Sequence, residues 1–158
     1  FNWMIVGRGV CEIRKKHPDC EKLGIILIEK FAKFAGKDTF NLPSQELIDL
    51  YCSADFFALP TLIETFGMAL VEAMAAGLPI VTTDAPGVRD IIEEGNEGFK
   101  VPAGDAEAFA KKLADLIPNI ELRMKISKNS LKSSRNYDWK NVSRRYLDFY
   151  DEIGKTFE

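Results

Sequence analysis

Short apolar runs alternate along this sequence with segments whose apolar residues recur at three- and four-residue steps. A short apolar run bounded by glycine or proline is typical of a buried strand, and the longer repeat is typical of an amphipathic helix. Strands and helices that alternate in this way form βαβ units around a parallel sheet. The sequence therefore predicts an α/β fold: one domain over residues 1–158, with a parallel sheet and helices on both of its faces.

The expected strands cover residues 3–9, 38–42 (a weaker candidate), 55–60, 79–84 and 99–102. The expected helices cover residues 19–34, 45–54, 67–77, 87–95 and 105–117, a stretch from about residue 120, and residues 138–153. Helix 19–34 is predicted from apolar residues at helical spacing, with Pro18 at its start and Gly36 after its end. Ser44 is the expected cap of the next helix.

Composition limits the classes of function. The chain has 158 residues, 46% of them hydrophobic, and a net charge of −3, which favours neither nucleic acid nor a membrane surface as partner. No apolar run approaches the roughly 20 residues of a membrane span, and no basic, apolar leader is present. Three cysteines without a CxxC pair indicate free thiols, without disulfides or a zinc site. These features predict a cytoplasmic location.

Two further features of the chain carry weaker expectations. Phe1 is not a methionine and already begins an apolar run, which suggests a piece of a longer protein. Residues 121–145 are rich in lysine and arginine, which favours a solvated helix face, with peripheral contact to anionic lipid at the inner face of the membrane as the alternative.

The junction between strand 55–60 and helix 67–77 is the candidate site. Ligands of open parallel sheets bind outside the carboxyl ends of the strands. A helix that begins there has unpaired N–H groups and the positive end of its dipole at the same edge. Gly67 lets the backbone approach an anion closely. We therefore expect the amides of Gly67, Met68 and Ala69 to bind a phosphate or diphosphate.

Two acidic residues, Glu64 and Glu72, lie on either side of this turn in the sequence. An acid near a phosphate site commonly accepts hydrogen bonds from ribose, which suits Glu72, and Glu64 could hold hydroxyls of the group that the diphosphate carries. The pair therefore favours a nucleoside diphosphate sugar. The alternative is that Glu64 only favours the helix N-terminus electrostatically and that Glu72 is half-exposed on a surface helix.

The sequence between residues 59 and 117 closely resembles the carboxyl-terminal, donor-binding domain of the group 1 glycosyltransferases, retaining enzymes of the GT-B architecture. The matching pattern is a Glu, a Phe-Gly turn and a second Glu eight positions after the first, then a small-residue helix and glycine turns. The matching residues are Glu64, Phe66, Gly67, residues 72–77, Pro79, Gly87, Gly98, Pro102 and Asp105. Residues 5–9 and 137–153 resemble the family's flanking strand and closing helix.

The resemblance implies roles for these residues. Glu64 would hold hydroxyls of the donor sugar nearest the reacting centre, Phe66 would belong to the donor site, and Glu72 would hold the ribose. The nucleobase would lie near Phe40, Asn41 and Leu42, where the family usually has a glycine. Pro86 before Gly87 departs from the family's usual Gly-Gly pair, which bears on the shape of the donor-sugar loop.

The resemblance also implies missing parts: a first strand with its Arg- and Lys-bearing loop, and an amino-terminal acceptor-binding domain. The isolated chain is therefore expected to bind nucleotide weakly and to be inactive, because the cations that neutralise the leaving diphosphate and the domain that closes over it are absent. No cofactor and no obligatory metal are expected.

Two alternative functions remain open. A nucleotide-sugar epimerase or a sugar phosphorylase of the same architecture would use a similar site, although the spacing of the Glu pair favours transfer. A non-catalytic nucleotide-binding module would bind nucleotide with full affinity without a partner domain.

Overall fold

The computed structural model describes residues 2–7, 10–29 and 43–156. The chain forms two compact units, residues 1–50 and 51–158, and each is described by itself. That the whole chain is one donor-binding domain stays a prediction.

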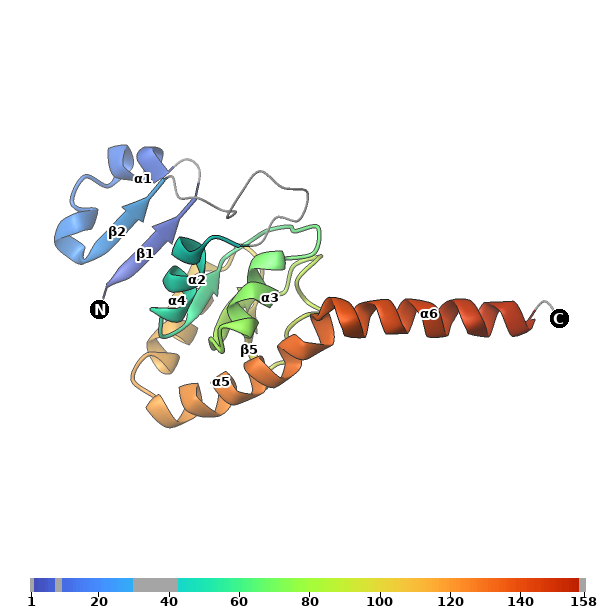
Figure 1. The fold of residues 1–158 in the computed structure, drawn as a ribbon. Helices are drawn as coiled ribbons and strands as arrows, with labels where there is room; N and C mark the ends of the chain where they lie inside the picture. Colours follow the sequence, from blue (N-terminus) through green and yellow to red (C-terminus); the bar gives the residue numbers. More distant parts are fainter. Residues whose placement is uncertain (1, 8–9, 30–42, 157–158) are drawn as a thin grey trace. The chain divides into compact units, whose positions relative to one another are not determined.

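The first unit contains a parallel pair of strands, β1 (Trp3–Val6) and β2 (Ile25–Ile28), with Trp3 opposite Ile25 (Figure 1). Between them lie helix α1 (Val10–Lys16) and the 3-10 helix η1 (Cys20–Leu23). The strand predicted at residues 3–9 is therefore confirmed.

The prediction of a helix over residues 19–34 is wrong within the described part, and α1 was not predicted. Gly24 adopts the left-handed conformation (φ 75°, ψ 22°) and ends η1, because its N–H turns back to the carbonyls of Cys20 and Glu21. The apolar run that follows pairs with β1 instead of continuing a helix. A short apolar run fits a strand as well as a helix, so its spacing could not decide between them. Pro18 follows α1 and begins no helix.

Helix α2 (Gln45–Cys52) is confirmed with its cap, since the N–H of Leu47 donates to Ser44 Oγ at 3.2 Å. The strand predicted at residues 38–42 lies outside the described residues.

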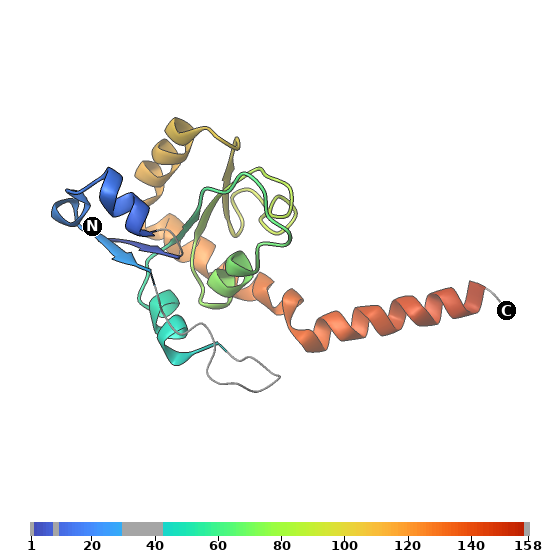
Figure 2. The ribbon, with the colours of Figure 1, turned by 90° about the horizontal axis from the view of Figure 1, so that it is seen from above.

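The second unit contains a parallel sheet of strands β3 (Phe57–Leu59), β4 (Ile80–Thr83) and β5 (Gly98–Val101), in that order. Helices α3 (Met68–Ala75) and α4 (Ala106–Leu116) pack on opposite faces of this sheet (Figure 2). The predicted α/β class, with a parallel sheet and helices on both faces, is confirmed.

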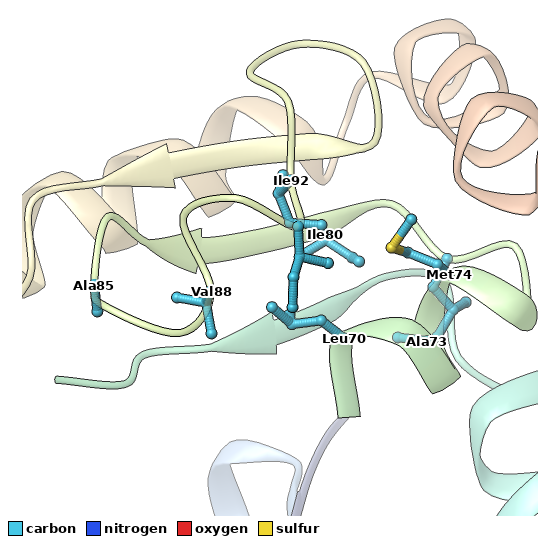
Figure 3. Packing of buried hydrophobic residues seen from close by; sticks show 9 residues of the cluster. Leu70, Ala73, Met74, Ile80, Ala85, Val88 and Ile92 are labelled. Carbon is cyan, nitrogen blue, oxygen red and sulfur yellow. The ribbon is translucent and has the colours of Figure 1, made fainter. Parts of the chain in front are cut away.

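The core of the second unit lies between α3 and β4 (Figure 3). Every residue of β4 is buried, as expected of a central parallel strand. Its Ile80 packs with Leu70 and Met74 of α3. The segment after β4 closes this cluster with four further apolar residues, Ala85, Val88, Ile91 and Ile92. Burial of these side chains therefore fixes α3 against the sheet.

The prediction of a helix over residues 87–95 is wrong, because this segment forms a series of turns. A tertiary contact holds the turns in place: Glu97, 4% exposed, accepts hydrogen bonds from the N–H of Glu93 at 2.9 Å and from Asn96 Nδ2 at 2.7 Å. The same carboxylate accepts from Ser133 Oγ of α5 (Ile120–Ser134) at 2.5 Å. The buried carboxylate of Glu97 therefore links this loop to α5 through hydrogen bonds.

The remaining helices are confirmed. Asp105 caps α4 and Asn119 caps α5, and a short 3-10 helix η2 (Arg135–Tyr137) leads into α6 (Trp139–Thr156). The apolar face predicted for this last helix is largely exposed, with Tyr146, Phe149 and Ile153 among its exposed residues. No helix in the described ranges combines the length and apolar character needed to cross a bilayer.

The basic stretch runs through α5, η2 and the start of α6. Two of its arginines donate to main-chain carbonyls: Arg123 to those of Leu116 and Ile117, and Arg145 to that of Asn136 at 2.8 Å. These contacts suit the ends of helices, where carbonyls lack partners. Contact of this stretch with anionic lipid stays a prediction.

Candidate functional site

The segment that leaves β3 at the carboxyl edge of the sheet is fastened to the neighbouring strand. The hydroxyl of Thr82 donates to the carbonyl of Leu59 at 3.1 Å, and that of Thr83 donates to the carbonyl of Thr61. Thr82 and Thr83 are both buried. Two hydrogen bonds from buried threonines of β4 therefore fix the path of the chain toward Glu64.

Glu64 is held by its main chain. Its N–H donates to the carbonyl of Pro86 at 3.1 Å. Gly87 has φ +84°, and a Cβ built there would lie 1.9 Å from the carbonyl oxygen of Glu64. Only glycine fits this contact, which explains why position 87 requires glycine. The proline at position 86 takes part through its carbonyl. The Glu64 side chain is partly buried.

Gly67 forms the N-cap of α3 in the left-handed conformation, at φ 68° and ψ 46°. The carbonyl of Gly67 accepts from the N–H of Leu70 at 2.8 Å. The N–H groups of Gly67, Met68 and Ala69 donate to no residue in the described part of the chain. These are the unpaired donors expected at a helix N-terminus, and they lie where an anion would gain most from them.

Glu72 is partly buried on α3, and its carboxylate has a partner that the sequence analysis missed. The hydroxyl of Tyr51, near the end of α2, donates to Glu72 Oε2 at 2.8 Å. Burial raises the pKa of Tyr51 well above its ordinary value, and so do the negative charge of Glu72 and the hydrogen bond that its carboxylate accepts from the phenol. The two residues are 21 positions apart, and no local pattern signals their contact.

Phe66 is 46% exposed, and its ring meets that of Tyr137 edge-on, with 6.0 Å between centroids and an interplanar angle of 68°. Leu62, Ile63 and Met68 are also exposed. Four apolar side chains therefore surround the turn between Glu64 and α3 without being buried in this unit.

The structure thus puts the predicted residues Glu64, Phe66, Gly67, Met68, Ala69 and Glu72 on one strand-to-helix junction, and their roles toward a ligand stay predictions. The predicted nucleobase residues Phe40, Asn41 and Leu42 lie outside the described residues. No group of three His, Cys, Asp or Glu side chains suited to a metal ion occurs among the residues that the structure describes.

Comparison with solved structures shows which fold the chain adopts. The chain superposes on the Anabaena Alr3699/HepE structure in complex with UDP with a TM-score of 0.74 and 20% identity, over 96% of this chain and 41% of that one. It also matches the C-terminal domain of LpcC, a glycosyl transferase group 1 family protein of Francisella tularensis, with a TM-score of 0.62 and 26% identity, over 80% and 60% of the two chains. The fold is the Rossmann-like half of a GT-B glycosyltransferase.

Comparison of sequences gives the family. The profile described as "Glycosyl transferases group 1" matches residues 37–133. The chain is 38% identical over 155 residues to a phosphatidyl-myo-inositol mannosyltransferase of Mycobacterium leprae and 30% identical over 133 residues to a D-inositol 3-phosphate glycosyltransferase of Corynebacterium urealyticum. The two matches include 97% and 84% of this chain, but only 38% and 30% of the length of the respective relatives. The chain belongs to the group 1 glycosyltransferases and matches their carboxyl-terminal domain.

Proposed function

We propose that this chain binds the donor of a retaining glycosyltransferase, which moves a sugar from a nucleoside diphosphate sugar to an acceptor. The amides of Gly67, Met68 and Ala69 bind the diphosphate. Glu72 accepts hydrogen bonds from the ribose, and Glu64 holds hydroxyls of the transferred sugar.

The observation that carries this proposal is the N-terminus of α3, whose first three N–H groups have no partner among the described residues at the carboxyl edge of a parallel sheet. An N-terminus of this kind favours an anion through its unpaired donors and its dipole. The fixed main chain of Glu64 supports a role in orientation, because a group that positions substrate must itself be held in place. One structural relative, Anabaena Alr3699/HepE, has crystal structures in complex with UDP and with UDP-glucose, which supports the class of donor.

The complete parent performs the transfer in this proposal, because the chain spans only about 30–38% of the curated relatives described above. The remainder of the parent supplies acceptor binding and closure over the donor. Transfer needs stabilisation of the charge that develops on the departing diphosphate and exclusion of water, so the isolated chain binds nucleotide weakly and does not turn over. No metal is required for donor binding.

Calorimetry with UDP, GDP and ADP tests the donor site on this chain. Glu72→Ala is expected to weaken binding of the preferred diphosphate by roughly 1.5–3 kcal/mol, about ten- to hundredfold in Kd. The matched control is Glu107→Ala, which removes an exposed glutamate from the first turn of α4 and should leave the affinity unchanged. Unchanged affinity in Glu72→Ala would remove Glu72 from the site.

The reaction itself is tested on the full-length parent with a panel of nucleotide sugars and product analysis by mass, with and without EDTA. A sugar transferred to an acceptor with retained anomeric configuration, at the same rate in EDTA, is the expected result. An epimerised or phosphorolysed sugar would overturn the assignment to transfer. Full nucleotide affinity in this chain alone would favour a non-catalytic binding module.

A further inference from the structure

The contact between Tyr51 and Glu72 links the helix that precedes β3 in the sequence to the helix that follows it. Tyr51 lies near the end of α2 and Glu72 in the second turn of α3, and the Tyr51 hydroxyl is 2.8 Å from Glu72 Oε2. A carboxylate can only accept, so the phenol donates and the bond is charge-assisted. This pairing fixes which of the two carboxylate oxygens is occupied.

The tyrosine ring is itself packed between neighbouring side chains. Its ring lies 5.8 Å from the ring of Phe57 on β3, at an interplanar angle of 48°, and both rings pack against the apolar cluster between α3 and β4. No donor within the described part of the chain reaches the second oxygen of Glu72, Oε1. A donor that is held by packing therefore occupies one oxygen and leaves the other available for a ligand hydroxyl.

We propose that Tyr51 is a positioning residue for ribose recognition: it holds the Glu72 carboxylate so that Oε1 accepts from the ribose hydroxyls. This inference rests on the proposed role of Glu72 in donor binding. A carboxylate held in advance loses less side-chain freedom on binding than one that must be ordered by the ligand. The contribution of Tyr51 should therefore appear only when the ligand carries ribose hydroxyls.

The test compares UDP with 2′,3′-dideoxy-UDP, which lacks both hydroxyls, in amide-detected titrations of this chain. The quantity of interest is the dissociation constant of the dideoxy analogue divided by that of UDP, which measures how much the ribose hydroxyls contribute to binding. Tyr51→Phe keeps the ring and its contact with Phe57, and it removes only the hydroxyl. We expect this variant to lower the ratio about three- to tenfold, through weaker binding of UDP and nearly unchanged binding of the dideoxy analogue.

A merely structural role for Tyr51 would weaken both ligands equally and leave the ratio unchanged, which would overturn the proposal. The ratio is independent of the folded fraction, because both ligands meet the same folded population, so a destabilised variant remains informative. The matched control is Tyr137→Phe, which removes the hydroxyl of another partly buried tyrosine and should keep the ratio of the unsubstituted chain.

Glu72→Ala separates this inference from the proposed function. Loss of discrimination in Glu72→Ala but not in Tyr51→Phe would overturn the role of Tyr51 and leave the proposed function in place. Full discrimination in Glu72→Ala would overturn ribose binding by Glu72 itself.

Discussion

Gly87 and Glu64 touch through their main chains: a Cβ at position 87 would lie 1.9 Å from the carbonyl oxygen of Glu64. The turn after β4 and the segment after β3 therefore meet at a point that admits no side chain. Since Glu64 also donates its N–H to the carbonyl of Pro86, the position of the proposed sugar-binding acid depends on this turn.

Gly87→Ala is expected to destabilise the chain beyond the roughly 1–2 kcal/mol that a left-handed backbone costs a non-glycine residue, because the contact with Glu64 must also open. The measurement is the free energy of unfolding in urea. The control is Gly95→Ala, since Gly95 has a similar φ of +78° but nothing within 4 Å of its added Cβ. Equal losses in the two variants would contradict the close approach.

Glu64→Ala in the full-length parent is expected to reduce turnover about ten- to hundredfold while changing the Kd of free nucleotide less than about threefold. The reason is that Glu64 contacts the transferred sugar in our proposal, and the free nucleotide lacks that sugar. Steady-state kinetics and calorimetry measure the two effects. Thr65→Ala, at the exposed neighbouring position, is the control. An equal loss of turnover and of nucleotide binding would argue against contact with the sugar.

Glu97→Ala is expected to lower the free energy of unfolding by about 1–3 kcal/mol, because it leaves the N–H of Glu93 and the hydroxyl of Ser133 without their acceptor. Urea denaturation measures this change. Asp115→Ala, at an exposed position on α4, should change stability little. If the free energy of unfolding falls equally in the two variants, the hydrogen bonds of Glu97 do not stabilise the packing of the loop against α5.

The contact between Tyr51 and Glu72 also predicts a dependence of stability on pH. Tyrosine in the unfolded chain has a pKa of about 10, and the pKa of folded Tyr51 is raised above that value. The unfolded state therefore loses this proton first, so the contribution of the Tyr51 hydroxyl to stability is complete below about pH 10 and falls as the pH rises further.

The stability advantage of the unsubstituted chain over Tyr51→Phe should accordingly be constant from pH 7 to about pH 9.5 and should shrink above about pH 10. Urea denaturation at several pH values measures it. Burial also raises the pKa of Tyr137, but that residue is present in both proteins, so its effect cancels. An advantage that stays constant through pH 11 would contradict the contact.

Local chemistry determined how well the sequence predicted the fold. Ser44, Asp105 and Asn119 cap their helices through hydrogen bonds within three residues, which is why those helix starts are readable from the sequence. The strand β2 and the turns after β4 depend on distant partners: β1 in one case, and α5 through Glu97 in the other. Spacing alone cannot reveal such partners.

The candidate site likewise combines features that local sequence reveals with features that depend on distant elements. The Glu-Phe-Gly turn is contiguous with α3, so the placement of Glu64, Gly67 and Glu72 at one junction could be predicted from their spacing. The hydroxyl partner of Glu72 lies 21 residues earlier on another helix, and the threonines that fix the approach to Glu64 belong to β4. Residues that support a site from other elements become visible only in the folded chain.

In our proposal, the N-terminus of α3 binds the diphosphate of the donor. The sharpest test is a titration of the isotope-labelled chain with UDP, followed by the amide resonances. We expect the amides of Gly67, Met68 and Ala69 to show the largest shifts, and we expect uridine, which lacks the diphosphate, not to shift them. Shifts confined to other parts of the chain, or equal shifts with uridine, would show that the diphosphate binds elsewhere or not at all.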